Sequence, residues 1–171
     1  QGSPVSSLEV CAVIALAFAK SAPNAQFFAF SDTFTPFPVL PTDTIRSITE
    51  RANYMNFGNT NCDIPILYAL ERKIPFDAFM VMTDSETWIR TNKSDLVRLG
   101  IVGENYRYNN NADIFGALLA AYRRRVVADA KNVVYATSSS EFTLNDPNDM
   151  LGLDVCGFTP EVGNIITNFI G

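Results

Sequence analysis

Four short, mainly apolar segments are spread along this chain of 171 residues, and the first of them contains a continuous apolar run. Apolar runs of this length without polar alternation are typical of strands that are buried on both faces of a sheet. They lie at 26–30, 77–82, 131–137 and 153–158. Between them, helical periodicity predicts helices at 8–20, 45–55, 63–73, 114–127 and 160–170. The order predicts an α/β fold: a doubly wound, mainly parallel sheet with helices on both faces, in three layers.

Local signals refine this prediction. Two serines directly before the first helix are expected N-caps, and Asp113 is the expected cap of the helix at 114–127. The helix at 63–73 is predicted to turn Ile64, Leu67, Tyr68 and Leu70 toward the core. The segment 33–40 contains two prolines and suits an edge ribbon. Its residues Phe34 and Phe37 either form an exposed contact patch or belong to the core.

The predicted sheet has no first strand. A doubly wound sheet usually has a central strand that leads into its first helix, whereas this chain opens on a helix. We therefore expect either an unusual start to the fold or a strand located upstream. A sheet without its central strand has unpaired backbone edges, which a neighbouring copy or a separate segment could fill.

Composition narrows the function. The net charge of −5 argues against a domain whose own surface grips phosphate backbones, because such domains usually have a basic face. The absence of histidine excludes a Ser-His-Asp triad, a Cys-His dyad and any histidine-ligated zinc site within this chain. The length and the 47% hydrophobic content predict one globular domain spanning residues 1–171.

Cysteine usage and hydropathy bear on the compartment. Three cysteines, Cys11, Cys62 and Cys156, are an odd number without a C-x-x-C spacing, so neither a disulfide framework nor a structural zinc is expected. We interpret them as buried, reduced thiols of a cytoplasmic protein. The apolar run at 10–19 is too short to span a bilayer, and no membrane association is predicted.

Polar side chains follow or flank the predicted strands where a ligand would sit in an open α/β sheet. The candidates are Asp32 after the first apolar run, Thr60 before a helix, and Asp84 and Glu86 after the second run. Carboxylate and hydroxyl oxygens suit a hard divalent cation such as Mg²⁺. An alternative is structural, with Asp84 capping a turn and Thr60 capping a helix.

Other candidate residues are less specific. Arg123, Arg124 and Arg125 could contact phosphate or an acidic partner, although a solvated helix end would carry the same residues. Cys62 has no nearby cation in the sequence that would lower its pKa, so a nucleophilic role is not expected.

Several ordered motifs together resemble a known family. The residues AFSD at 29–32, GNTNC at 58–62 and TDSET at 83–87 resemble the strand ends of a von Willebrand factor A-type domain. More narrowly, with EFTLNDPND at 141–149 and DVCGF at 154–158, they resemble the C-terminal domain of the Ro autoantigen (TROVE) proteins. The resemblance implies a von Willebrand A-like, Rossmann-like three-layer sandwich.

The same resemblance implies a metal-ion-dependent adhesion site. Thr60 and Asp84 match the second and third metal-binding loops of the family, and Ser3, Asp32 and Glu86 are further candidate ligands. The first loop of the family, D-x-S-x-S, is absent, so the site is incomplete here. Residues 88–111 resemble an insertion beside the same face, with room for one short helix, and Trp88 is a candidate partner contact there.

Three functions are compatible with these patterns. The first is a non-enzymatic protein-interaction module in which an acidic side chain of the partner completes the coordination of a divalent cation. The oxygen ligands indicate that this cation is Mg²⁺. The second is a structural, self-associating subunit on the same fold, with the metal site lost. The third is a magnesium-dependent hydrolase using Asp32, Asp84 and Glu86, without a phosphate-cradling glycine loop to support it. RNA is expected to associate only indirectly, through a ribonucleoprotein, because the family binds RNA through a helical ring that these residues do not contain.

Overall fold

The computed structural model describes residues 6–30, 34–55, 61–83, 89–136, 144–157 and 161–171. Eleven elements lie within the described residues, in the order α1 (Ser7–Ser21), β1 (Phe28–Phe30), β2 (Phe34–Pro36), α2 (Ile45–Asn53), α3 (Ile64–Arg72), β3 (Ala78–Thr83), α4 (Lys93–Arg98), α5 (Asn111–Arg125), β4 (Lys131–Ala136), β5 (Gly152–Cys156) and α6 (Val162–Ile170). The predicted alternation of helices and strands is thus confirmed, with boundaries shifted by a few residues.

The strands form two sheets. The main sheet has the order β3-β4-β5 and is parallel throughout, with Ala78 opposite Lys131 at one end and Thr83 opposite Ala136 at the other. The second sheet is the antiparallel pair of β1 and β2, in which Phe28 lies opposite Pro36. The mainly parallel sheet predicted from the apolar runs is confirmed. The proline-containing ribbon pairs with β1 in a separate antiparallel sheet.

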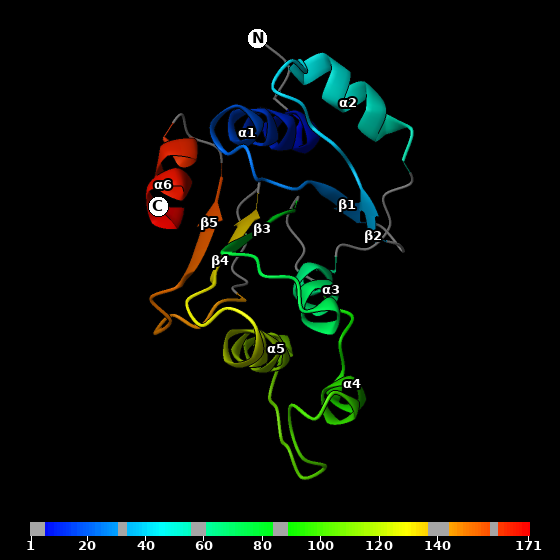
Figure 1. Cartoon of the computed structure of the whole chain (residues 1–171), viewed down its shortest axis with the longest axis vertical. Helices are drawn as coiled ribbons and strands as arrows, with labels where there is room; N and C mark the ends of the chain where they lie inside the picture. The colour runs from blue at the N-terminus through cyan, green and yellow to red at the C-terminus, as the bar shows by residue number, and fades with distance from the viewer. Residues whose placement is uncertain (1–5, 31–33, 56–60, 84–88, 137–143, 158–160) are drawn as a thin grey trace.

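Helices cover both faces of the main sheet (Figure 1). Alternate residues of β3 separate the two faces: Phe79 and Val81 pack with α3, α4 and α5, whereas Met80 and Met82 pack on the opposite side. On that opposite side, Val133 and Tyr135 of β4 contact residues of α1 and α6. This period-two division of a buried strand produces the three-layer α/β sandwich.

Helix α1 packs against other elements on two of its faces, as its apolar sequence predicts, and Val13 on a third face is exposed. Ser6 caps it and forms a capping box with Glu9, in which each side chain accepts a hydrogen bond from the other residue's backbone N–H. Val10 packs toward the sheet and α6, whereas Ala12 packs with Ile48 of α2 in a separate cluster. The small alanine side chains on this face of α1 let α2 approach it closely.

Two expectations about strand and helix ends are wrong in detail. The strand predicted at 26–30 is shorter and its Phe28 is only half-buried, because β1 pairs with β2 instead of lying inside the main sheet. Helix α5 is capped by Asn110, whose side chain accepts a hydrogen bond from the backbone N–H of Asp113. Asp113 therefore lies inside the first turn of the helix that it was expected to cap.

Two expectations about burial are also wrong. Tyr68 of α3 is half-buried and packs against Phe28 and Phe34 of the β1–β2 pair instead of the core. Leu67 is also half-buried, but it packs against the core as predicted. Cys156 is exposed near the end of the outer strand β5, whereas Cys62 is buried as expected.

No helix among the described residues is long and apolar enough to cross a membrane. Within the same residues the three cysteines are free thiols.

Candidate functional site

The predicted cation ligands Ser3, Asp32, Thr60, Asp84 and Glu86 lie outside the described residues, as does Trp88. Their neighbours in sequence are described. Phe34 follows residues 31–33, Asn61 follows 56–60, and Ile89 follows 84–88.

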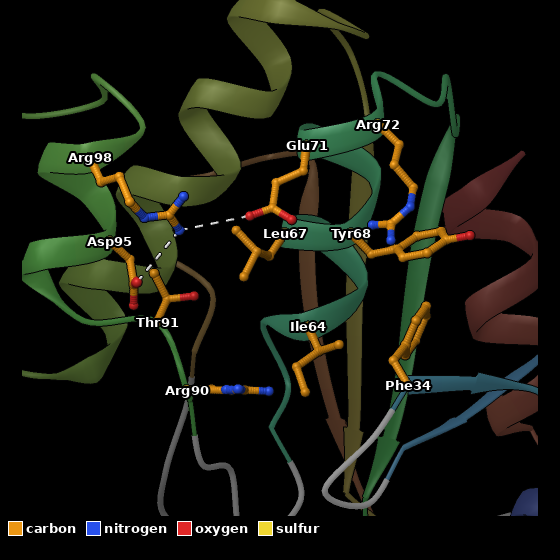
Figure 2. A pocket seen from close by; sticks show the side chains of 10 residues that line it. All are labelled: Phe34, Ile64, Leu67, Tyr68, Glu71, Arg72, Arg90, Thr91, Asp95 and Arg98. Carbon is orange, nitrogen blue, oxygen red and sulfur yellow. Dashed lines mark ion pairs between the residues drawn. The ribbon is translucent and has the colours of Figure 1, made fainter.

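A pocket of about 390 Å³ joins all three flanking regions. Phe34 comes from β2, Ile64 from the first turn of α3, and Arg90 and Thr91 from the segment that leads into α4. Figure 2 shows Phe34, Tyr68 and Arg72 on one side of this pocket and Thr91, Asp95 and Arg98 on the other. Three chain segments that are far apart in sequence thus line one pocket.

One buried carboxylate holds two of these segments together. Asp63 is fully buried at the start of α3, yet its side chain does not cap its own helix. Instead it accepts hydrogen bonds from the backbone N–H of Arg90 at 2.8 Å and of Thr91 at 2.7 Å, and from the Thr91 hydroxyl. These three donors replace the water that an ionised carboxylate loses on burial. Asp63 thereby fixes the residues after 84–88 to the residues after 56–60.

An aromatic cluster joins the third segment to α3. The Phe28 and Phe34 rings stack with centroids 4.4 Å apart, and Phe34 contacts the Tyr68 ring at 4.9 Å. The Arg72 guanidinium lies over the Tyr68 ring, 4.1 Å from its centroid. These contacts attach the β1–β2 pair to α3 through stacking and a cation–π interaction.

The pocket has an excess of cationic side chains. Arg72, Arg90 and Arg98 line it together with only two carboxylates, Glu71 and Asp95. Both carboxylates are near Arg98, at 3.9 and 3.6 Å respectively. Among the described residues, Arg72 and Arg90 form no ion pair. The pocket can therefore offer two guanidinium groups to an anionic ligand.

Cys62 lies beside this region but is unsuited to nucleophilic chemistry. Its side chain is fully buried. Burial, together with the negative charge of Asp63, raises the pKa of the Cys62 thiol to about 12. A thiolate is the reactive form, so the sequence-based expectation that Cys62 is not a nucleophile agrees with its surroundings.

The side chains of the three consecutive arginines, Arg123, Arg124 and Arg125, make different contacts. Arg123 forms an ion pair with Asp149 at 2.8 Å and donates to the Ala130 carbonyl oxygen. Arg125 donates to the carbonyl oxygens of the two residues that follow α4, and Arg124 is exposed. Arg123 and Arg125 thus hold loops against α5, and Arg124 alone of the three keeps an exposed side chain without such contacts among the described residues.

A cation site is not formed by the described residues themselves. No group of three or more acidic or cysteine side chains among them could hold a metal ion. The cation and its predicted ligands therefore stay a prediction from the sequence motifs. Sequence reasoning missed Asp63, Tyr68, Arg72 and Arg90, whose roles depend on contacts between distant segments.

The comparisons with known proteins agree with the fold. The family model described as "Ro60 vWA domain" matches residues 1–98 and 99–170. The chain is 28% identical over 158 residues to the "RNA-binding protein RO60" of Deinococcus radiodurans, covering 92% of this chain and 26% of that protein. It is 27% identical over 169 residues to the protein of the same name from Caenorhabditis elegans, covering 98% of this chain and 23% of that protein.

A solved structure shows the same architecture. The crystal structure of the Deinococcus radiodurans RO (RSR) protein superposes on 97% of this chain with a TM-score of 0.76 and 27% sequence identity. The match covers 29% of that chain. The chain thus spans about a quarter of the length of the relatives it matches.

Proposed function

Because this chain belongs to the Ro60 vWA domain family, we propose that it is a non-enzymatic module that binds a protein partner through a divalent cation. The observation that carries the proposal is the pocket in which Phe34, Ile64 and Arg90 meet. Each of these residues lies close in sequence to a candidate cation ligand: Asp32, Thr60 or Glu86. A binding site at the strand ends of an α/β sheet is also the general location for ligands in such folds.

The proposed cation ligands are Thr60 and Asp84, with Ser3, Asp32 and Glu86 as further candidates. Hydroxyl and carboxylate oxygens suit Mg²⁺, which takes few protein ligands and keeps several waters. When bound, the cation would accept a carboxylate oxygen from an acidic side chain of the partner. The residues of this chain would hold the cation, and the buried carboxylate at the start of α3 would keep the flanking segments at a fixed separation.

RNA has an indirect place in this proposal. The relatives are named RNA-binding proteins, but this chain matches only 26% and 23% of their lengths. Its net charge of −5 does not favour a phosphate-binding surface. We infer that the chain meets RNA only through a ribonucleoprotein to which it is attached or bound.

Calorimetric titration with Mg²⁺ tests the cation. Asp84→Ala should lower the affinity for Mg²⁺ by about tenfold or more, or abolish the heat of binding, because a carboxylate ligand is lost. Asp129→Ala is the matched control, since Asp129 is an exposed carboxylate that forms no ion pair with described residues.

Partner binding tests the module. A protein partner, once identified by crosslinking, should stay bound in Mg²⁺ and be released by a chelator. The Asp84→Ala variant should fail to bind the partner even in Mg²⁺. A chain that gives no heat with Mg²⁺ and keeps its partner in the chelator would refute the proposal.

A second candidate function is self-association. Among the described residues β3 pairs with β4 alone, so its other edge has no strand partner there. An unpaired strand edge is a template for pairing with another chain. Light scattering distinguishes the two candidates: a defined oligomer of this chain alone favours assembly, whereas a monomer favours the interaction module.

A further inference from the structure

The geometry points to a specific class of partner: the pocket between β2, α3 and α4 binds an acidic peptide segment, with Arg72 and Arg90 as the groups that recognise its carboxylates. The inference rests on the proposed function in that it assumes a protein partner. It goes beyond that function by assigning recognition to arginines that no sequence motif selects and that need no cation.

Contacts hold the main chain of Arg90 and the guanidinium group of Arg72. Arg90 has its backbone N–H bound to the buried Asp63 carboxylate at 2.8 Å, so the position of its main chain is fixed. Arg72 has its guanidinium held over the Tyr68 ring. Figure 2 shows the Arg90 side chain extending toward Ile64 and the Arg72 side chain turned onto Tyr68. A guanidinium group that is already held, as that of Arg72 is, loses less conformational entropy when it binds a carboxylate.

The balance of charge favours an anion. The two carboxylates of the pocket are both near Arg98, which leaves Arg72 and Arg90 without an ionic partner among the described residues. Guanidinium groups bind carboxylates with paired, charge-assisted hydrogen bonds. The wall between the arginines is apolar, formed by Ile64 and Leu67. The pocket therefore suits a segment in which acidic residues flank an aliphatic side chain.

Peptide is favoured over RNA by the aromatic contacts. Single-stranded RNA is usually bound by stacking of its bases on free aromatic faces. Tyr68 has Arg72 over its ring and Phe34 against it, and Phe34 is stacked on Phe28. The rings of the cluster are thus engaged with one another.

The test uses a fluorescein-labelled peptide, acetyl-Gly-Asp-Asp-Leu-Asp-Asp-Gly-amide, and measures fluorescence anisotropy in a chelator. The double variant Arg72→Glu with Arg90→Glu should weaken binding by about tenfold or more, because it replaces attraction with like-charge repulsion. Arg107→Glu is the matched control, since Arg107 is an exposed arginine in the loop between α4 and α5. Binding that survives in the double variant overturns the inference.

A gain-of-affinity variant guards against misfolding of the double variant. Glu71→Gln removes an exposed carboxylate from the pocket and should strengthen peptide binding by about two- to threefold. Unchanged or weaker binding by this variant overturns the inference. Binding of an oligouridylate with the same arginine dependence, in place of the peptide, would overturn it as well.

The peptide also separates this inference from the proposed cation site. The inference is supported if the peptide binds in the chelator, if this binding needs the two arginines, and if Asp84→Ala does not affect it. This holds whether or not the chain binds Mg²⁺. Binding that needs Mg²⁺ and Asp84 but not the arginines supports the proposed function and overturns the inference.

Discussion

Asp63 and Thr91 are joined by two hydrogen bonds although 28 positions separate them in the sequence: the carboxylate of Asp63 accepts both the backbone N–H and the hydroxyl of Thr91. Both residues are buried. The pair connects the beginning of α3 with the segment that leads into α4. In sequence, the first follows the candidate cation ligand Thr60 and the second follows the candidate ligand Asp84. A buried carboxylate is stable only where hydrogen-bond donors satisfy its oxygens. Because these donors belong to Thr91, the pair holds the α3 and α4 sides of the pocket together.

We expect Asp63→Asn to destabilise the chain by about 2–3 kcal/mol. The amide keeps the size of the side chain but replaces one acceptor oxygen by a donor that faces backbone N–H groups. Thr91→Val should cost less, about 1 kcal/mol, because it removes only the hydroxyl donor. Urea unfolding monitored by circular dichroism measures both. Equal losses in the two variants would contradict a special role for the carboxylate.

A second buried polar centre supports the far end of the main sheet. The Asn145 side chain accepts a hydrogen bond from the Asn132 amide at 2.9 Å and donates to the Leu153 carbonyl oxygen and the Asp154 carboxylate. It thereby joins the loop before β5 to β4 and β5. A Cβ atom added at Gly152 would lie 3.0 Å from the Asn145 amide carbon, so glycine is needed there for this close approach.

We therefore expect Gly152→Ala to destabilise the chain by about 1–3 kcal/mol through overpacking against Asn145. Part of the cost should disappear in an Asn145→Ala background, which removes the two side-chain atoms at 3.0 Å and keeps the Cβ at 3.1 Å. Thermal unfolding of the two single variants and the double variant gives the coupling energy. Gly116→Ala is the control, since nothing within 4 Å would meet its Cβ and the helix should gain stability. Additive effects of Gly152→Ala and Asn145→Ala would refute the close-approach explanation.

The sequence predicts the helices and strands well because their signals are local. The capping serine before α1, the apolar run of β3 and the prolines of the β1–β2 ribbon each act within a few residues. The ordered strand-end motifs also identify the fold family, which the comparison with known proteins confirms. Periodicity alone, however, places Tyr68 in the core, whereas it lines the pocket.

The contacts that form the pocket are not visible in the sequence because their partners are distant. Asp63 has the sequence signature of the first residue of a helix, and nothing near it shows that its acceptors serve Arg90 and Thr91. The cap of α5 is ambiguous for a related reason: Asn110 and Asp113 are both good caps, and only the backbone geometry selects Asn110. The predicted cation ligands lie outside the described residues and stay a prediction.

An ion pair links α2 to the segment that follows β2. Because one member of the pair is a carboxylate, the free energy of unfolding of the chain should depend on pH. Arg51 donates to both carboxylate oxygens of Asp43, at 2.8 and 3.1 Å, and to the Pro38 carbonyl oxygen. The Arg51 guanidinium, with the Leu40 backbone N–H, holds the pKa of Asp43 well below its usual range. A carboxyl whose pKa is lower in the folded state binds protons more readily when unfolded.

Asp43 should therefore contribute its full stabilisation above the unfolded pKa of about 3.9, and the contribution should decline as the pH falls from there through the lower folded pKa. At neutral pH we expect Asp43→Asn to cost about 1 kcal/mol, because Arg51 is 43% exposed and solvent screens the pair. Urea unfolding of both proteins at several pH values measures the difference. Arg46→Gln, which breaks a pair exposed at both side chains, is the control. A difference that grows on acidification would contradict the expected direction.

The cysteines provide a chemical test of the core. Cys156 is exposed at the end of β5, whereas Cys62 is fully buried with its pKa raised to about 12 by burial and by Asp63. We expect a thiol reagent to modify Cys156 rapidly in the folded chain and Cys62 only at the rate of unfolding, because buried thiols form little thiolate. Peptide mass spectrometry after timed labelling follows each site. Asp63→Asn should speed labelling of Cys62 by weakening the hydrogen bonds around it, while Cys156 serves as the internal control. Fast labelling of Cys62 in the unmodified sequence would show that the start of α3 opens without unfolding of the sheet.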